Sequence, residues 1–148
     1  MNLSSMINTF NKHFVYTKDG KLDAWISHDF DIYAPTTIKG DCDDYSFTLK
    51  SILEEHTDYS CKVMKGLFKG EGHMILEVDT KEYLGVVYID NIYKQFLTKE
   101  KLENLGYSNF KYPNAFEVFS KYYIVGWIIK YYLKSVNKIK EKYCQKQK

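Results

Sequence analysis

The stretch that most constrains this chain runs from Gly40 to Leu53, where a turn passes directly into an amphipathic helix. Gly40 and Asp41 are usual residues of a turn and of a helix N-cap. On a helical wheel, one face of the following segment is formed by Cys42, Tyr45, Leu49, Ile52 and Leu53, and the opposite face by Asp44, Thr48, Ser51 and Glu55. The pattern predicts a helix from about Asp41 to His56, with a cysteine in its first turn on the inward face.

The cysteine at the start of this helix is placed like a nucleophile. The positive end of the helix dipole favours the thiolate of Cys42, which is the reactive form. The carboxylates of Asp41, Asp43 and Asp44 oppose that effect, because negative charge nearby disfavours another anion. We therefore weigh two roles for these aspartates. They are either ligands of Ca²⁺, which accepts several carboxylate oxygens in irregular geometry, or a helix cap whose other carboxylates are solvated or pair with lysines.

The chain after this helix supplies a base and a group to orient it. Strands are predicted for three segments rich in β-branched and aromatic residues: Tyr59 to Phe68, His73 to Val78 and Tyr83 to Asp90. An antiparallel hairpin with its turn at Lys81-Glu82 places His73 opposite Asp90, with Cβ atoms roughly 5 Å apart. A cysteine hydrolase needs such a base and such an orienting carboxylate. Cys42, His73 and Asp90 therefore form a coherent acyl-transfer site.

The other segments predict a small α+β fold, in which the cysteine helix packs on an antiparallel sheet within a single domain of residues 1–148. The expected elements are a helix from Met6 to Phe14, a strand at Val15 to Thr17, an ordered loop from Asp23 to Ile38 on the cysteine helix, a helix from Lys99 to Leu105, and a helix from about Trp127 to Tyr143. The segment from Tyr107 to Tyr123 has no clear pattern. His13 and His28 stay open as alternative bases.

The composition of the chain argues against several classes of function. All 21 basic residues are lysines and the net charge is +2, so the chain lacks the arginine fork that favours nucleic-acid recognition. Three cysteines without a CxxC spacing indicate neither a disulfide framework nor a zinc site. The first residues do not resemble a secretory signal, and no apolar run is long enough to span a bilayer, so we expect a cytoplasmic protein.

The C-terminal residues are strongly basic. Residues 134–148 contain six lysines and one glutamate, a net charge of +5. We favour a solvated helix face or chain end for this segment over a surface that contacts an anionic membrane or a nucleic acid.

Several of these motifs resemble those of the bacterial transglutaminase-like cysteine proteinases. Gly40-Asp41-Cys42-Asp43-Asp44-Tyr45 is similar to that family's Gly-Asp-Cys-Glu-Asp-Tyr signature, with Asp43 in place of the glutamate. The upstream matches are Asn11 to Asp19, Asp23-Ala24-Trp25 and Tyr33-Ala34-Pro35. The downstream matches are Gly72-His73-Met74-Ile75-Leu76 and Tyr88-Ile89-Asp90-Asn91. The resemblance covers about residues 7 to 92.

The resemblance implies a papain-like or transglutaminase-like fold with Cys42 as nucleophile, His73 as general base and acid, and Asp90 orienting the imidazole. It implies a cysteine peptidase or amide hydrolase that acts on a protein or peptide through a thioester, with no obligatory cofactor. Adhesin-processing members of the family depend on calcium through acidic positions that match Asp41, Asp43 and Asp44.

Two alternatives to hydrolysis stay open from the sequence. One is transglutaminase-type transfer of the acyl group to an amine, and the other is a non-catalytic binding module on the same fold. The candidate oxyanion donors are the Cys42 backbone N–H and the side chains of Trp25 and Tyr33.

Overall fold

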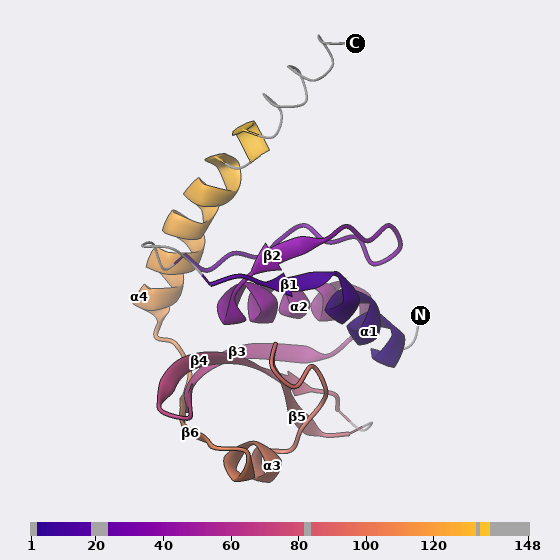
Figure 1. Ribbon diagram of the computed structural model, residues 1–148, viewed down its shortest axis with the longest axis vertical. Helices are drawn as coiled ribbons and strands as arrows, with labels where there is room; N and C mark the ends of the chain where they lie inside the picture. Colours follow the sequence, from indigo (N-terminus) through magenta and orange to yellow (C-terminus); the bar gives the residue numbers. More distant parts are fainter. Residues whose placement is uncertain (1–2, 19–23, 82–83, 133, 137–148) are drawn as a thin grey trace.

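The protein has a mixed α+β architecture in which helices cover both faces of a four-stranded antiparallel sheet (Figure 1). The computed structural model describes residues 3–18, 24–81, 84–132 and 134–136. The expected elements also included Asp23, Tyr83, Leu133 and residues 137–143, which lie outside this range, as does most of the basic segment 134–148. The sheet has the order β5-β4-β3-β6, and its strands are β3 (Ser60–Phe68), β4 (Glu71–Asp79), β5 (Val86–Ile89) and β6 (Tyr107–Lys111). The expected α+β class is confirmed.

The hydrophobic core lies on both faces of this sheet. One face packs against α1 (Leu3–His13) and α2 (Cys42–His56), and the other is covered by α3 (Lys99–Asn104) and the segment before it. The three helices lie where the sequence predicts them, except that α1 begins at Leu3 and not at Met6, and that Phe14 belongs to the following strand. Positive φ at Gly106 (98°) ends the α3 region and turns the chain into β6, because glycine adopts this backbone conformation without strain.

A short parallel pair of strands leads the chain into α2. Strand β1 (Phe14–Tyr16) pairs with β2 (Ile38–Gly40), and Asp41 then caps the helix by accepting a hydrogen bond from the Asp43 N–H at 3.1 Å. A Cβ at position 40 would lie 2.4 Å from Asp44 Oδ2, so only glycine fits there. The turn therefore requires the glycine that precedes the cysteine, and it places Cys42 at the first position of the helix.

The polar side of α2 is buried in its first turns, which corrects the helical-wheel expectation. Asp44 and Thr48 are 2% and 0% exposed because the irregular segment 24–37 lies across them. The Ile26 N–H donates to Asp44 Oδ1 at 3.0 Å, and the His28 N–H donates to Thr48 Oγ1 at 3.0 Å. These side chains satisfy backbone groups of a segment that forms no strand. The expected packing of this loop on the helix is confirmed.

The hairpin of β4 and β5 forms as expected, but its register differs from the prediction. Leu76 pairs with Ile89 and Val78 with Val87, so each residue of β5 lies two positions further along β4 than expected. The reason is a longer turn, which is closed by a hydrogen bond from the Thr80 N–H to the Gly85 carbonyl at 3.0 Å. Side chains alternate between the two faces, so a shift of two residues leaves every side chain on its expected face.

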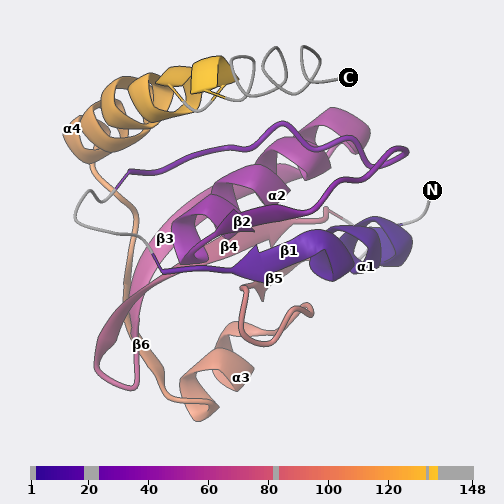
Figure 2. The same ribbon diagram turned by 45° about the horizontal axis from the view of Figure 1, so that its top comes forward.

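The C-terminal helix begins at Ala115, not near Trp127 as expected. It consists of α4 (Ala115–Glu117), the π-helix η1 (Val118–Gly126), and helical turns at 127–132 and 134–136. A capping box between Asn114 and Glu117 fixes its start. Figure 2 shows this helix beside the 24–37 segment. The approach is close, since a Cβ at position 126 would lie 2.2 Å from the Trp25 carbonyl oxygen. Within the described residues, none of the helices has the length and apolar character needed to cross a membrane.

Replacing Asp44 tests whether the 24–37 segment is held by this buried carboxylate. Asp44→Ala should lower the free energy of unfolding by about 1–3 kcal/mol, because the N–H of Ile26 loses its acceptor. Glu55→Ala, at an exposed position on the same helix, is the control and should change it by less than about 0.5 kcal/mol. Urea unfolding should show the same decrease in the free energy of unfolding of Asp44→Ala in buffer with Ca²⁺ and in buffer with a chelator. A loss confined to Ca²⁺-containing buffer would instead make Asp44 a metal ligand.

Candidate active site

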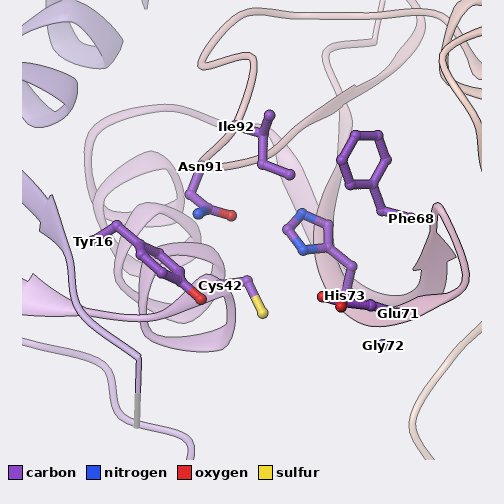
Figure 3. A pocket seen from close by; sticks show the side chains of 8 residues that line it. All are labelled: Tyr16, Cys42, Phe68, Glu71, Gly72, His73, Asn91 and Ile92. Atoms are coloured by element: carbon purple, nitrogen blue, oxygen red, sulfur yellow. The ribbon is translucent and has the colours of Figure 1, made fainter.

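Cys42 lies between two pockets on the surface of the protein. One has a volume of about 400 Å³ and the other of about 430 Å³, and both are lined by Cys42, Gly72 and His73. Figure 3 shows the thiol and the imidazole facing the first of these pockets, together with Tyr16 and Asn91. The structure thus brings together the first residue of α2 and the histidine near the start of β4. A substrate that extends in both directions from the thiol would meet a pocket on either side.

His73 is hydrogen-bonded to the carboxylate that the sequence analysis assigned to it. Its Nε2 lies 2.9 Å from Asp90 Oδ2, and Asp90 directly follows β5. The observed register places Asp90 opposite Ile75, so His73 is its diagonal neighbour on the same face. Burial raises the pKa of Asp90, but hydrogen bonds from His73 and Tyr107 more than offset it and leave the pKa below its usual value. Asp90 is therefore an anion, which accepts the Nε2 proton and leaves Nδ1 as the basic nitrogen.

Asp90 is fully buried, and both of its oxygens are hydrogen-bonded. Oδ1 accepts from the backbone N–H groups of Ile92 at 3.2 Å and Tyr93 at 2.9 Å. Oδ2 accepts from the Tyr107 hydroxyl as well as from His73. Its side chain is 0% exposed, so these four donors replace water. The carboxylate is thereby held at one place relative to the imidazole.

Tyr107 was missed by the sequence analysis. It is the first residue of β6, in the segment that showed no clear periodicity, and pairing of β6 with β3 brings it to Asp90. Burial and the nearby Asp90 raise the pKa of Tyr107, so its hydroxyl stays protonated and acts as a donor. The rings of Tyr107 and Phe68 also lie 5.7 and 6.0 Å from the ring of His73 and limit its orientation. Nothing in the local sequence around Tyr107 signals these contacts.

The thiol of Cys42 is neutral in this site, which corrects the expectation of a favoured thiolate. Burial raises the pKa of Cys42 to about 12, and Asp41 and Asp43 add to the increase. The backbone N–H groups of Met74 and of Cys42 itself lower it, but by less. Burial thus outweighs the helix terminus. Any reaction in which this sulfur acts as a nucleophile must therefore first remove the thiol proton.

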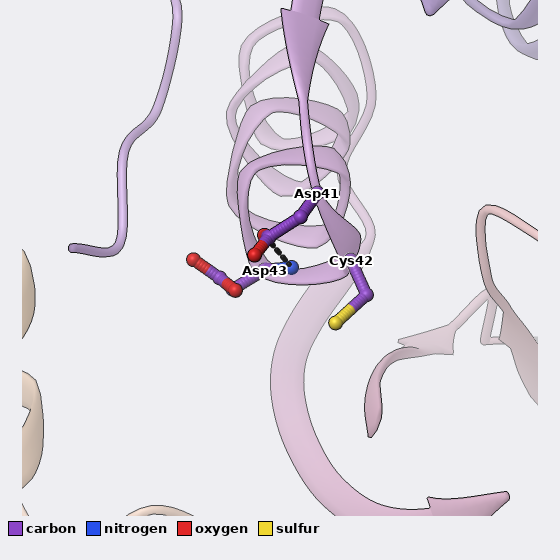
Figure 4. A group of neighbouring side chains, drawn as sticks. All are labelled: Asp41, Cys42 and Asp43. Carbon is purple, nitrogen blue, oxygen red and sulfur yellow. Dashed lines mark hydrogen bonds between the residues drawn. The ribbon is translucent and has the colours of Figure 1, made fainter. Parts of the chain in front are cut away.

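The acidic residues around Cys42 do not form one cluster of three carboxylates. Asp41 and Asp43 lie beside the thiol, and the nearest ligand atoms of these three residues are within 4.8 Å of one another (Figure 4). Asp44 points away, towards the Ile26 N–H and to within 3.6 Å of His28. Two carboxylates supply at most about four oxygen ligands, whereas Ca²⁺ usually takes about six to eight. Calcium binding stays a prediction, with Asp41 and Asp43 as its remaining protein ligands.

The other candidates from the sequence separate into those at the site and those away from it. Trp25 lines the larger pocket with Cys42, whereas Tyr33 is 71% exposed and packs against His56 at the far end of α2. Tyr33 is thus not an oxyanion donor. Tyr16, which the sequence analysis had not considered, lines the smaller pocket. Burial raises the pKa of Tyr16, and the nearby acidic groups, Asp41 among them, raise it further.

The alternative bases lie elsewhere. His13 packs near Phe30, at 6.3 Å between ring centroids, and His28 lies against Asp44. Both pockets that Cys42 lines contain His73 and neither contains another histidine. His73 is therefore the base that the geometry supports.

No protein-family model, no curated protein and no solved structure matches this chain with statistical significance. The functional interpretation therefore depends on the residues and geometry of the site.

The protonated thiol predicts the pH dependence of alkylation. With a pKa of about 12 for Cys42, the thiolate fraction, and with it the rate of iodoacetamide labelling, should rise about tenfold per pH unit between roughly pH 7 and 9. Peptide mass spectrometry resolves this rate from that of Cys61, which is buried and should label more slowly. A rate at Cys42 that is fast and constant across this range would show a preformed thiolate and contradict the account.

Proposed function

We propose that this protein is a cysteine peptidase or amide hydrolase in which Cys42, His73 and Asp90 act as a triad. The carrying observation is the 2.9 Å contact between His73 Nε2 and Asp90 Oδ2 beside a thiol at a helix start. The cysteine helix packs against antiparallel strands, of which one carries the histidine and the next ends at the aspartate. This arrangement and this order along the chain support a papain-like or transglutaminase-like fold.

In the acylation step the sulfur attacks the carbonyl carbon of an amide. Nδ1 of His73 takes the thiol proton as the S–C bond forms, because the resting thiol is neutral. The carboxylate of Asp90 stabilises the imidazolium that results. His73 then gives the proton to the leaving nitrogen, the C–N bond breaks, and a thioester to Cys42 remains.

In the deacylation step water takes the place of the amine. Nδ1 of His73 accepts a proton from the water molecule while the water oxygen attacks the thioester carbonyl. The C–S bond then breaks, and His73 returns the proton to the departing sulfur. The products are a carboxylic acid and free Cys42. The developing oxyanion in both steps is assigned to the backbone N–H of Cys42, with the protonated Tyr16 hydroxyl as a second donor in the same pocket.

The two pockets indicate the class of substrate. They meet at the thiol and the imidazole, which supports an extended polypeptide that occupies one pocket on each side of the cleaved bond. Gly72 lines both pockets, and a Cβ there would have no atom within 4 Å, so this wall stays open to an approaching backbone.

Substitution of Asp90 tests the triad. Asp90→Asn should lower turnover of a fluorogenic peptide library by about 10²- to 10⁴-fold, because the neutral amide no longer holds His73 in the reactive tautomer. Asp79→Asn is the matched control, since Asp79 is an exposed carboxylate at the end of β4 and should leave turnover unchanged. Cys42→Ala should abolish turnover.

Thermal melting separates this role from a structural one. If Asp90→Asn unfolds the protein while the folded fraction keeps full specific activity, Asp90 is not part of the catalytic machinery. The same assay with a primary amine added distinguishes hydrolysis from acyl transfer, because a transferase would form the amide in place of the acid.

A further inference from the structure

The C-terminal helix exposes a row of large apolar side chains, which is unusual for a surface helix. An ordinary surface helix buries its apolar stripe and exposes its charges. Here a row of large apolar side chains at helical spacing is 56–77% exposed, and it consists of Phe116, Phe119, Tyr123, Trp127 and Tyr131. We call this row the aromatic face. It carries no charged residue.

Three charged residues of the same helix, Glu117, Lys121 and Lys130, contact the body of the protein. Glu117 accepts a hydrogen bond from the Lys65 ammonium group, and Lys130 Nζ lies 2.7 Å from Asp29 Oδ1. Lys121 Nζ lies 5.1 Å from the ring centroid of Trp25. The helix is attached to the domain through these contacts, through Gly126, and through Val118 and Tyr122, which pack against the core. The aromatic face lies outside these contacts and is left exposed.

The charge of the neighbouring residues indicates which kind of partner would fit the aromatic face. The helix leads into residues 134–148, which carry a net charge of +5. This charge would repel the same segment of a second copy packed in parallel, but it attracts anionic lipid headgroups. Tryptophan and tyrosine are also the residues enriched at the interface between headgroups and acyl chains.

We propose that the aromatic face docks on an anionic lipid surface, with the helix lying in the interfacial plane and the basic residues contacting the headgroups. This surface is separate from the pockets around Cys42. It would hold the proposed active site beside a membrane while leaving its chemistry unchanged.

Vesicle flotation of the full chain tests the proposal. The protein should float with vesicles of equal parts phosphatidylglycerol and phosphatidylcholine, and should bind phosphatidylcholine alone much more weakly. The double variant Trp127→Gln/Tyr131→Gln should weaken binding by at least about tenfold, because two apolar side chains no longer enter the interface. Tyr33→Gln removes an equally exposed aromatic ring outside the helix and should bind as the unmodified protein does.

Charge and fluorescence give independent readouts. Lys134→Gln with Lys138→Gln should weaken binding about fivefold for each charge removed. Trp127 is 62% exposed and Trp25 is 2% exposed, so anionic vesicles should shift the emission to shorter wavelength, and Trp127→Phe should remove the shift.

Two results would overturn the proposal. One is the absence of binding and of any emission shift with anionic vesicles. The other is a dimer in solution without lipid that Trp127→Gln dissociates, which would assign the aromatic face to a second copy. Turnover of a soluble peptide should be the same in the double variant, so failure of the proposed catalytic function would be seen separately.

Discussion

The structure of the site depends on one buried carboxylate. Asp90 is excluded from water and is kept ionised by a tyrosine hydroxyl, two backbone N–H groups and an imidazole. An unpaired anion at this position would cost several kcal/mol, on the order of the whole stability of a small domain. These donors come from the 90–93 turn, β4 and β6, so the sheet must assemble before the carboxylate is stabilised. The folding of the sheet and the orientation of His73, the proposed catalytic base, therefore depend on the same contacts.

A second set of contacts positions Cys42, the proposed nucleophile. Gly40 lets the chain turn against Asp44, Asp41 caps the helix, and the 24–37 segment is bound by side chains on the far side of the same helix. Asp41 and Asp44 therefore have structural roles that charge alone would not indicate. Asp41 and Asp43 also raise the pKa of the Cys42 thiol, so the proposed reaction needs His73 to remove the thiol proton during attack.

The residues of the site could be predicted from the sequence more reliably than their surroundings. The cysteine helix was found because capping and apolar periodicity are local signals. The pairing of His73 with Asp90 was placed on the correct face despite a register error, because the shift was an even number of residues. Tyr107 and the burial of Asp44 could not be predicted, since both depend on segments that meet only in three dimensions. The exposed aromatic face of the C-terminal helix could not be predicted either, because a helical period does not tell which face of a helix is covered.

The central claim is that Cys42 forms a covalent acyl intermediate with the help of His73. Intact-protein mass spectrometry with rapid quenching tests it directly, with an activated peptide ester as acyl donor. The account predicts an acyl adduct on Cys42 that forms and then decays by hydrolysis, and acylation slowed by about 10²- to 10⁴-fold in His73→Ala. Equal acylation rates in the two proteins, or an adduct on Cys61 instead of Cys42, would contradict it.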